Sequence, residues 1–241
     1  MPDAAVHVWQ LSLAGSPAAI EAAATVLSRE EREQAARFVF ERDRTAYVLA
    51  HGLLREVLSR YAGRAAGELE FHRSPAGKPA LVSASADDRS PGLSFNLSHS
   101  GGRALLAVSD GREIGVDIEK VRHDLPALEI AVRYFFRSEY AAIAEAPPHG
   151  RHEVFFRYWT AKEAVLKGPG LGLGFPLEDF EIRFETGLVC ATVASMNESR
   201  LAGDWFVRAI PQEPGWAAAI AARGSAWTLE TPPYPPPPSR P

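Results

Sequence analysis

The sequence predicts an α+β fold of two similar lobes, in which antiparallel sheets are packed with helices. In each half, helix-type segments with apolar residues every three or four positions precede segments that alternate as strands do. A faint internal repeat supports this organisation, because RFVF (37–40) resembles RYFF (133–136) and YVLAHGLL (47–54) resembles YWTAKEAV (158–165). We therefore expect the two lobes to be related by a pseudo-twofold axis.

The expected division places an N-terminal lobe at residues 1–112 and a C-terminal lobe at residues 113–227. The remaining residues, 228–241, include TPPYPPPPSRP, which is too rich in proline for regular structure. We expect them to form a disordered tail.

Composition narrows the class of protein. The 241 residues carry a net charge of −4 and a single cysteine. Nucleic-acid binders are usually basic, so nucleic acid is not an expected partner. One cysteine excludes an internal disulfide framework, which is typical of a reducing compartment. The N-terminus lacks the pattern of a signal peptide and no stretch is apolar for the length of a membrane span, so we expect a cytoplasmic protein without membrane contact.

The N-terminal half begins with an alternating strand, followed by helices. The helix from Arg44 to Tyr61 is the clearest, with Tyr47, Leu54 and Val57 on its apolar face. The segment RALLAVSDGREIGVDIE predicts a hairpin with Asp110 and Gly111 in its turn. The other elements expected here are a strand at 6–13, helices within 17–38, and strands at 69–73, 79–82 and 93–98.

The C-terminal half repeats the order of helices and then strands. Its expected helices span 126–135, 138–145 and 152–167, and the segment APPHG separates the last two. Its expected strands lie at 179–185, 188–194, 204–210 and 216–222. Cys190 falls in the second of these strands, where we expect it in the core.

Two carboxylates share one face of a predicted strand in GVDIEKV. Alternation places Asp117 and Glu119 on the face opposite Val116 and Ile118. Two such carboxylates repel each other unless a cation lies between them, and oxygen ligands suit Mg²⁺. The alternatives are a solvated strand face or a salt bridge to a neighbouring basic residue.

A lysine interrupts the apolar stripe of the helix that contains YWTAKEAVLKG. Lys162 lies between Trp159 and Leu166 at helical spacing. A Glu163–Lys167 surface pair explains Lys167 but not Lys162, because an unpaired buried charge costs several kcal/mol. Lys162 therefore needs an acidic partner or an anionic ligand, and the strand carboxylates are the obvious supply. Such a cluster around a divalent ion, with both lysines alongside, would hold a phosphate group.

Two further segments carry polar residues at turns. Ser98 and His99, in FNLSHS, end a strand just before two glycines, a position suited to ligand contact or to a structural histidine. Lys78, in the GKP turn, is either a solvated lysine or a phosphate contact. A hydrolase triad of Ser98, His99 and Asp117 is disfavoured, because the nucleophile elbow is absent and adjacent strand residues face opposite sides. The glycine-rich 168–174 follows a helix and does not match a dinucleotide fingerprint.

Four motifs in this order resemble the 4′-phosphopantetheinyl transferase family, in its larger single-chain, Sfp-like class. The family signature pairs G-(V/I)-D-x-E with W/F-x-x-K-E-(A/S)-x-x-K about forty residues later, here residues 115–119 and 159–167. The upstream motifs are present as GKP (77–79) and FNLSH (95–99). The likeness runs from about residue 28 to about residue 185.

The resemblance implies a monomer with coenzyme A in a cleft between the lobes. The phosphopantetheine arm would pass to a serine of an apo acyl, peptidyl or aryl carrier protein, from fatty acid, polyketide or nonribosomal peptide synthesis, with release of adenosine 3′,5′-bisphosphate. Its implied site residues have these roles: Asp117, Glu119 and Glu163 hold Mg²⁺; Glu163 is the base; Lys167 stabilises the leaving phosphate; Lys162 supports the acidic cluster; Lys78, Ser98 and His99 contact coenzyme A phosphates.

The chain also departs from the family pattern. His51 stands where many relatives have an arginine that helps to hold the nucleotide end of coenzyme A, and we expect His51 to bind there too, though weakly when neutral. Glu31 and Gln34 stand where lysines are common. The resemblance implies a basic or apolar docking patch for an acidic carrier. We expect it on the helix 126–137, with Arg133 and Arg137, and on the loop around Arg122. Two other functions are weighed: a non-catalytic module that binds coenzyme A or a carrier, and a Mg²⁺-dependent pyrophosphate hydrolase.

Overall fold

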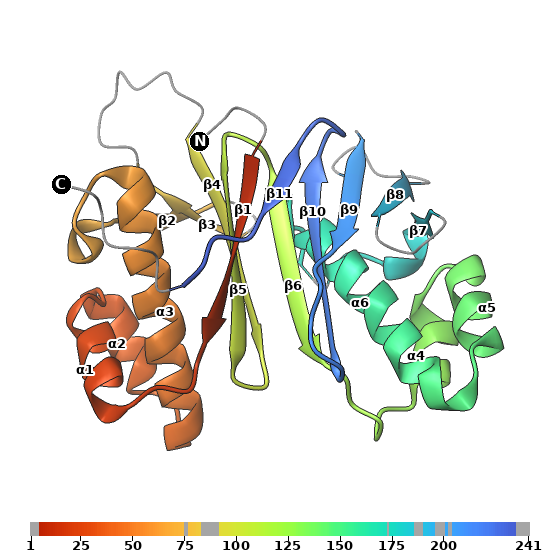
Figure 1. Ribbon diagram of the computed structural model, residues 1–241, viewed down its shortest axis with the longest axis horizontal. Helices are drawn as coiled ribbons and strands as arrows, with labels where there is room; N and C mark the ends of the chain where they lie inside the picture. Colours follow the sequence, from red (N-terminus) through yellow and green to blue (C-terminus); the bar gives the residue numbers. More distant parts are fainter. Residues whose placement is uncertain are drawn as a thin grey trace.

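Two sheets pack face to face, and helices cover the outer face of each, so the protein has four layers (Figure 1). In the figure, the helices within residues 17–62 cover the first sheet on the left, and the helices within residues 127–167 cover the second on the right. This arrangement is seen in a computed structural model, which describes residues 5–74, 77–82, 92–172, 174–185, 190–195, 201 and 204–234. The α+β class predicted from the sequence is confirmed.

The first half supplies three helices and three strands of a mixed sheet, whose fourth strand, β11 (Thr228–Glu230), comes from the end of the chain. Its elements are β1 (Ala5–Ser12), α1 (Pro17–Thr25), α2 (Arg29–Ala35), α3 (Glu41–Ala62), η1 (Ala66–Glu68), β2 (Phe71–Arg73), β3 (Pro79–Leu81), β4 (Leu93–Ser100) and β5 (Arg103–Asp110). The strand order of its sheet is β11-β1-β5-β4, and β2 and β3 form a separate pair.

The second half supplies an antiparallel sheet and three further helices. Its elements are β6 (Ile114–Lys120), α4 (Ala127–Tyr134), α5 (Arg137–Glu145), η2 (Pro148–Gly150), α6 (Arg151–Lys167), η3 (Leu177–Asp179), β7 (Phe180–Phe184), β8 (Cys190–Ser195), β9 (Trp205–Ala209), β10 (Trp216–Arg223) and β11 (Thr228–Glu230). The strand order is β6-β10-β9-β8-β7. The side chain of Cys190 lies outside the described residues, so its expected place in the core stays a prediction.

Local sequence accounts for where the first helices begin and end. Ser16 caps α1 by accepting the N–H of Ala19, and Ser28 and Glu31 form a reciprocal capping box on α2. The long helix α3 ends at Gly63, whose φ of 61° is in the left-handed region that glycine adopts without strain.

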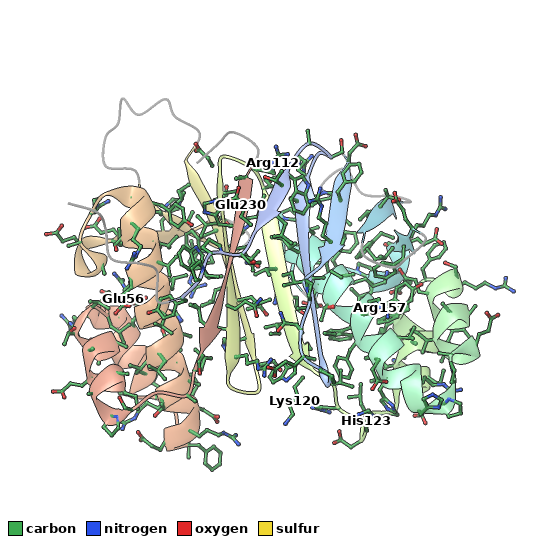
Figure 2. The ribbon with its side chains drawn as sticks, viewed as in Figure 1. Glu56, Arg112, Lys120, His123, Arg157 and Glu230 are labelled. Atoms are coloured by element: carbon green, nitrogen blue, oxygen red, sulfur yellow. The ribbon has the colours of Figure 1, made fainter. Side chains whose placement is uncertain are left out.

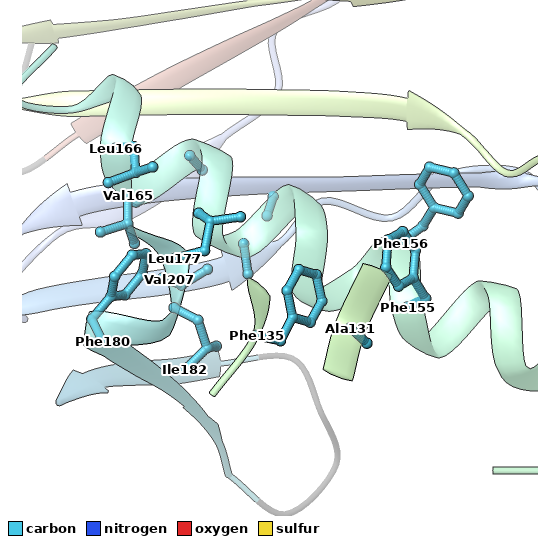
Figure 3. Packing of buried hydrophobic residues seen from close by; sticks show 14 of the residues in the cluster. Ala131, Phe135, Phe155, Phe156, Val165, Leu166, Leu177, Phe180, Ile182 and Val207 are labelled. Carbon is cyan, nitrogen blue, oxygen red and sulfur yellow. The ribbon is translucent and has the colours of Figure 1, made fainter. Parts of the chain in front are cut away.

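Three apolar clusters hold the layers together. One lies between the first sheet and its helices, one between the second sheet and its helices, and one between the two sheets. Figure 3 shows the second of these, in which Phe135 and Phe155 stack with ring centroids 5.2 Å apart while Phe180 and Ile182 approach from β7. The cluster between the sheets contains Val116, which accounts for the apolar face of β6.

The expected hairpin around Asp110 and Gly111 is wrong. Strand β5 pairs with β1 and β4, whereas β6 pairs with β10, so the turn carries the chain from one sheet to the other. Alternation and a turn signal are the same for a hairpin and for such a crossing, and only the later strand β10 decides the pairing. The crossing lies between residues 110 and 114, where the sequence placed the boundary between lobes.

The expected disordered tail at residues 228–241 is wrong for its first part. Strand β11 pairs in parallel with β1 at the edge of the first sheet, with Glu230 opposite His7. Farther on, the Tyr234 hydroxyl donates to Glu56 at 3.0 Å and its ring packs edge-on against Trp9. Residues 235–241 lie outside the described part. The chain thus returns from the second sheet and ties itself to the first.

None of the helices in the described part of the chain combines the length and apolar content needed to cross a membrane.

Candidate active site

The site forms where α6 crosses β6, and a glycine makes the crossing possible. A side-chain carbon added to Gly115 would lie 2.1 Å from the carbonyl oxygen of Ala164 and 2.5 Å from the amide nitrogen of Gly168. Backbone atoms cannot move aside, so position 115 requires glycine. This close approach brings the end of α6, with Glu163 and Lys167, beside Asp117 of β6.

A lysine and a serine hold the first carboxylate. Lys167 Nζ donates to Asp117 Oδ1 at 2.5 Å and to Ser98 Oγ at 2.9 Å. The Ser98 hydroxyl donates in turn to Asp117 Oδ1 at 2.8 Å. Asp117 is only 2% exposed, so this charge is held almost out of water by the lysine and the hydroxyl.

The pKa values of the other two carboxylates, Glu163 and Glu119, are raised mainly by burial. Burial first, and then the negative charges of Asp117 and Glu119, raise the pKa of Glu163 to about 7, although Lys167 lowers it. Burial is also the main reason that the pKa of Glu119 is raised, against the hydrogen bond from Ser100. The charges of Asp117 and Glu119 thus act on Glu163, and the charge of Asp117 acts on Glu119.

The residues at this place suit a divalent cation. Asp117 Oδ2 and Glu163 Oε1 are buried and have no hydrogen-bond partner, a costly state that a cation would relieve. Within the described ranges, however, no group of three His, Cys, Asp or Glu side chains has an arrangement that could hold a metal ion as it stands. In this arrangement the ammonium of Lys167 occupies Asp117 Oδ1, so metal binding would require the side chains to rearrange.

The expected place of Lys162 in the acidic cluster is wrong. Its ammonium pairs with Glu139 of α5 at 2.9 Å, and both side chains are fully buried. It also donates to the carbonyl oxygens of Leu177 and Phe180, at 2.8 Å and 2.6 Å. The prediction that Lys162 has an acidic partner is confirmed, but the partner was expected on β6. Helix α6 instead directs Lys162 towards α5 and β7. Lys162 is thus part of the C-terminal core.

Lys78 joins the two halves of the chain. Its ammonium donates to the carbonyl oxygens of Ile114 and Gly168, at 2.8 Å and 2.6 Å. The second of these follows the C-terminal end of α6, where a cation is favourable. Burial lowers the pKa of Lys78 to about 8. Lys78, which was expected at a loop tip, therefore lies between the two halves of the chain. Two of its three N–H groups donate to carbonyl oxygens of the C-terminal half.

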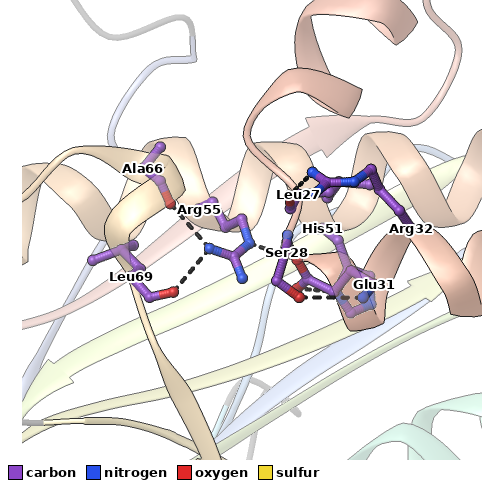
Figure 4. A network of polar contacts seen from close by, with 8 residues as sticks. All are labelled: Leu27, Ser28, Glu31, Arg32, His51, Arg55, Ala66 and Leu69. Carbon is purple, nitrogen blue, oxygen red and sulfur yellow. Dashed lines mark hydrogen bonds and ion pairs between the residues drawn. The ribbon is translucent and has the colours of Figure 1, made fainter.

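His51 is held on α3 by an acidic residue (Figure 4). Glu31 accepts from Arg55 Nε at 2.6 Å and lies 3.0 Å from His51 Nδ1. Burial alone would raise the pKa of Glu31, but the hydrogen bonds from His51, the Ser28 amide and Arg55 lower it to about 2. Tyr47 stacks on the ring of His51 with centroids 4.0 Å apart. The carboxylate of Glu31 is thus held between His51 and Arg55, two residues of α3.

His99 and Ser98 have different surroundings although they are adjacent. His99 is exposed, and its pKa is lowered by burial of part of the ring and then by the charges of Lys167 and His51. Ser98 is buried and its hydroxyl is already bonded to Asp117 and Lys167. His99 can meet a ligand, whereas the expected phosphate contact of Ser98 would require it to leave these partners.

Sequence reasoning missed two residues. Ser100 donates to Glu119 Oε2 at 2.7 Å, and the alternation of polar residues in FNLSHS was a signal for it. Glu139 is the partner of Lys162 and accepts the amides of Phe136 and Ile182, at 2.9 Å and 2.7 Å. The first of these bonds makes it the third residue of a helix start, which is where an acidic residue is favourable.

An apolar cavity of about 650 Å³ opens beside Glu119. Its walls come from α4, α6 and the segment before β7, and they are mainly aromatic and aliphatic. The residues around it are Glu119, Arg122, Leu125, Ile130, Tyr134, Phe155, Phe156, Trp159, Gly174, Phe175, Pro176, Leu177 and Glu178. Pockets of this size and lining typically hold the apolar part of a small molecule.

Comparison with known proteins gives a consistent result over both halves. Residues 12–110 match the family described as "4′-phosphopantetheinyl transferase, N-terminal". Residues 113–221 match the family described as "4′-phosphopantetheinyl transferase superfamily". The 4′-phosphopantetheinyl transferase HetI of Nostoc sp. is 34% identical over 222 residues, which cover 92% of this chain and 89% of HetI. The 4′-phosphopantetheinyl transferase Sfp of Bacillus subtilis is 29% identical over 81% of this chain and 82% of Sfp.

Among solved structures, the holo-[acyl-carrier-protein] synthase of Thermotoga maritima matches with a TM-score of 0.38 and 21% identity, over 46% of this chain and 62% of that one. This likeness is too low to support an argument.

Proposed function

Because the chain belongs to the 4′-phosphopantetheinyl transferase superfamily, we propose that it moves the phosphopantetheine arm of coenzyme A onto a serine of an apo carrier protein. Adenosine 3′,5′-bisphosphate leaves. The observation that carries the proposal is the meeting of Asp117 and Glu163, each with a buried oxygen that has no partner, beside the ammonium of Lys167. A site of this kind suits a cation and the pyrophosphate of the donor.

Asp117, Glu119 and Glu163 would hold Mg²⁺. The ion, when bound, supplies positive charge that offsets the charge of the pyrophosphate oxygens. Burial, followed by the charges of neighbouring carboxylates, raises the pKa of Glu163 and of Glu119, and a bound cation would offset both effects.

Glu163 is the base of the transfer. A serine hydroxyl is a weak nucleophile, and a carboxylate that accepts its proton activates it for attack. The serine oxygen forms a bond to the phosphorus that carries pantetheine, and the bond from that phosphorus to the bridging oxygen of the pyrophosphate breaks. The proton goes to Glu163, and the electron pair of the broken bond goes to the leaving adenosine bisphosphate.

Lys167 donates to the leaving phosphate. Its side chain is 28% exposed and lies at the end of α6, so it can turn from Asp117 Oδ1 to an incoming phosphate oxygen. A positive donor at this position stabilises the charge that develops as the pyrophosphate bond breaks.

The donor itself is held by residues of both halves. Lys78 uses two N–H groups on carbonyl oxygens, so one remains for a phosphate oxygen. The exposed ring of His99 is placed to contact the 3′-phosphate, with a weaker contribution from His51, which lies beside Glu31. The cavity that opens beside Glu119 would take the pantetheine arm.

Incubation with coenzyme A, Mg²⁺ and several apo-carriers, followed by intact-protein mass, tests the function. We expect the carrier to gain the mass of one phosphopantetheine, and Asp117→Ala to abolish this gain. A binding module would give no gain with any carrier. A pyrophosphate hydrolase would release adenosine bisphosphate without a carrier, and either result contradicts the proposal.

An apolar and basic patch on α4 is the expected docking surface for the carrier. Val132 and Tyr134 are 62% and 43% exposed, and the guanidinium of Arg133 lies 5.2 Å from the Tyr134 ring. Arg137 is exposed at the start of α5. Figure 2 shows Lys120 and His123 on the segment that leads from β6 to α4. The positive charges of Arg133, Arg137 and Lys120 would attract the acidic helix expected in carrier proteins.

Reversing both charges on this surface tests the docking prediction. Arg133→Glu with Arg137→Glu should raise the KM for the carrier about tenfold and leave the KM for coenzyme A unchanged, because surface charges mainly affect encounter. Arg42→Glu with Arg60→Glu, two exposed arginines of α3, is the matched control. Equal KM values for the carrier in the two double variants would exclude α4 as the docking surface.

A further inference from the structure

The two sheets meet at an edge where side chains take the place of a neighbouring strand. Within the described residues, strand β6 pairs with a strand, β10, on one side only. On its other side, its outward amides donate to side chains of β4. The Val116 amide donates to Asn96 Oδ1 at 2.8 Å, and the Lys120 amide donates to Ser100 Oγ at 3.2 Å. Between them, the Ile118 amide makes a longer contact of 3.4 Å to Ser98 Oγ.

These contacts have a constant register. Each β4 side chain meets the amide twenty residues later in the chain, at 96 and 116, at 98 and 118, and at 100 and 120. A constant offset means that β4 and β6 run in the same direction without slipping. We call Asn96, Ser98 and Ser100 the β4 ladder. Alternate residues of a strand lie on one side of it, which is why three polar residues two apart can do this.

Two rungs of the β4 ladder also hold the acidic residues. Ser98 accepts from the amide of residue 118 and donates to the carboxylate of Asp117 at 2.8 Å. Ser100 repeats this pattern one step on, because it accepts from the amide of residue 120 and donates to Glu119 Oε2 at 2.7 Å. Each hydroxyl therefore fixes a carboxylate relative to the backbone that carries it.

The hydroxyls occupy one oxygen of each carboxylate. At Asp117 the occupied atom is Oδ1, and the buried Oδ2 has no hydrogen-bond partner. At Glu119 the occupied atom is Oε2. The serines thus leave the second oxygen of each residue for a ligand while they restrict rotation of the side chain. Hydrogen bonds of this kind to ligating groups set both orientation and metal affinity.

We propose that Ser100 is a positioning residue of the transferase, and that it orients Glu119 for a divalent cation as Ser98 orients Asp117. This inference rests on the proposed function, in which those carboxylates hold Mg²⁺. The β4 ladder would link the N-terminal half to the metal site of the C-terminal half, so that the site is complete only when the two sheets are joined.

A purely structural role gives a different expectation. If Ser100 only joins the sheets, Ser100→Ala should lower stability and leave the affinity for cations unchanged. Ser109 is the matched control, because its hydroxyl also lies on the first sheet and is buried, but it donates to the carbonyl oxygen of Arg112, a residue outside the site.

The test measures Mn²⁺ binding by the full chain with coenzyme A, from the electron paramagnetic resonance signal of free Mn²⁺. We expect Ser100→Ala to weaken Mn²⁺ binding about tenfold or more. Ser100→Thr, which keeps a hydroxyl, should return it towards the wild-type value. Ser109→Ala should not change it. Thermal unfolding in chelator reports the effect of each variant on stability alone.

The outcomes separate this inference from the proposed function. A wild-type Mn²⁺ affinity in Ser100→Ala overturns the positioning role and leaves the transferase intact. An equal loss in Ser109→Ala overturns it too, because the effect would then be general. Absence of Mn²⁺ binding in the wild type overturns the inference even if carriers are modified. A weaker affinity in Ser100→Ala, in a protein that modifies no carrier, supports the positioning role while the proposed transfer fails.

Discussion

Glu163→Gln should abolish carrier modification, with kcat/KM reduced by at least about 10³-fold. The amide keeps the shape of the side chain but cannot accept the proton of the carrier serine, and general base catalysis contributes about 10²–10⁴-fold. Loss of a negative ligand would add to this effect. Intact-protein mass of the carrier, followed over time at saturating Mg²⁺, gives the rate.

The same substitution should stabilise the protein when no metal is present. The pKa of Glu163 is raised from 4.5 to about 7, so the folded state holds this proton more tightly than the unfolded state does. The stabilising effect of the raised pKa is present below about pH 4.5 and is lost as the pH rises to about 7. Above that, an ionised Glu163 costs the folded state about 3 kcal/mol, by 1.36 kcal/mol per pKa unit.

Urea unfolding in chelator checks this second effect. At pH 8, Glu163→Gln should be more stable than the wild type by up to about 3 kcal/mol, and at pH 5 by less than about 1 kcal/mol. Glu145→Gln, at an exposed residue that ends α5, should change neither activity nor stability. Activity of Glu163→Gln within tenfold of the wild type would remove its assignment as the base.

The acidic side of the site could be predicted because strands and helices impose fixed directions. Alternation alone placed Asp117 and Glu119 together, and the structure keeps Val116 and Ile118 in the apolar cluster behind them. The close approach of α6 depends on Gly115. The glycine is visible in the sequence, but the sequence does not show that α6 packs against it. Which face of a helix meets which strand is a tertiary property, so the crossing itself could not be derived.

The partner of Lys162 was assigned wrongly for the same reason. Periodicity showed that Lys162 and Glu163 are adjacent on α6, and adjacent helical residues point about 100° apart. One of them faces β6 and the other faces α5. The sequence could show that a buried lysine needs an acid, but not that Glu139, 23 positions earlier, is the one that α5 brings into contact.

Pairing between distant strands was equally hidden. The hairpin expected around Asp110 and the tail expected from residue 228 were both judged from local pattern. The edges of β5 and β6 are instead taken by β1, β4 and β10, and β11 joins β1 from the far end of the chain. Local sequence patterns predict where strands lie, whereas the pairing of strands in a sheet depends on how whole faces pack.

Lys162→Ala should be the most destabilising of the substitutions considered, at about 3–5 kcal/mol. It removes the partner of a carboxylate that is fully buried, and it leaves the carbonyl oxygens of Leu177 and Phe180 without their donor. Burial raises the pKa of Glu139 and lowers that of Lys162, and each charge opposes the effect on the other. Chemical unfolding of the variant, against the wild type, gives the loss.

A double variant separates the ion pair from the core that surrounds it. Lys162→Met with Glu139→Gln removes both charges at nearly constant volume, and it should be more stable than Lys162→Ala because no unpaired charge stays buried. If Lys162 instead supported Asp117 and Glu119 directly, the folded double variant would lose nearly all of its activity, as we expect of Lys167→Ala. We expect Lys162→Met with Glu139→Gln to keep most of its kcat below its unfolding temperature, because its 2.9 Å partner lies on α5 and the carboxylates of β6 are held by Ser98, Ser100 and Lys167.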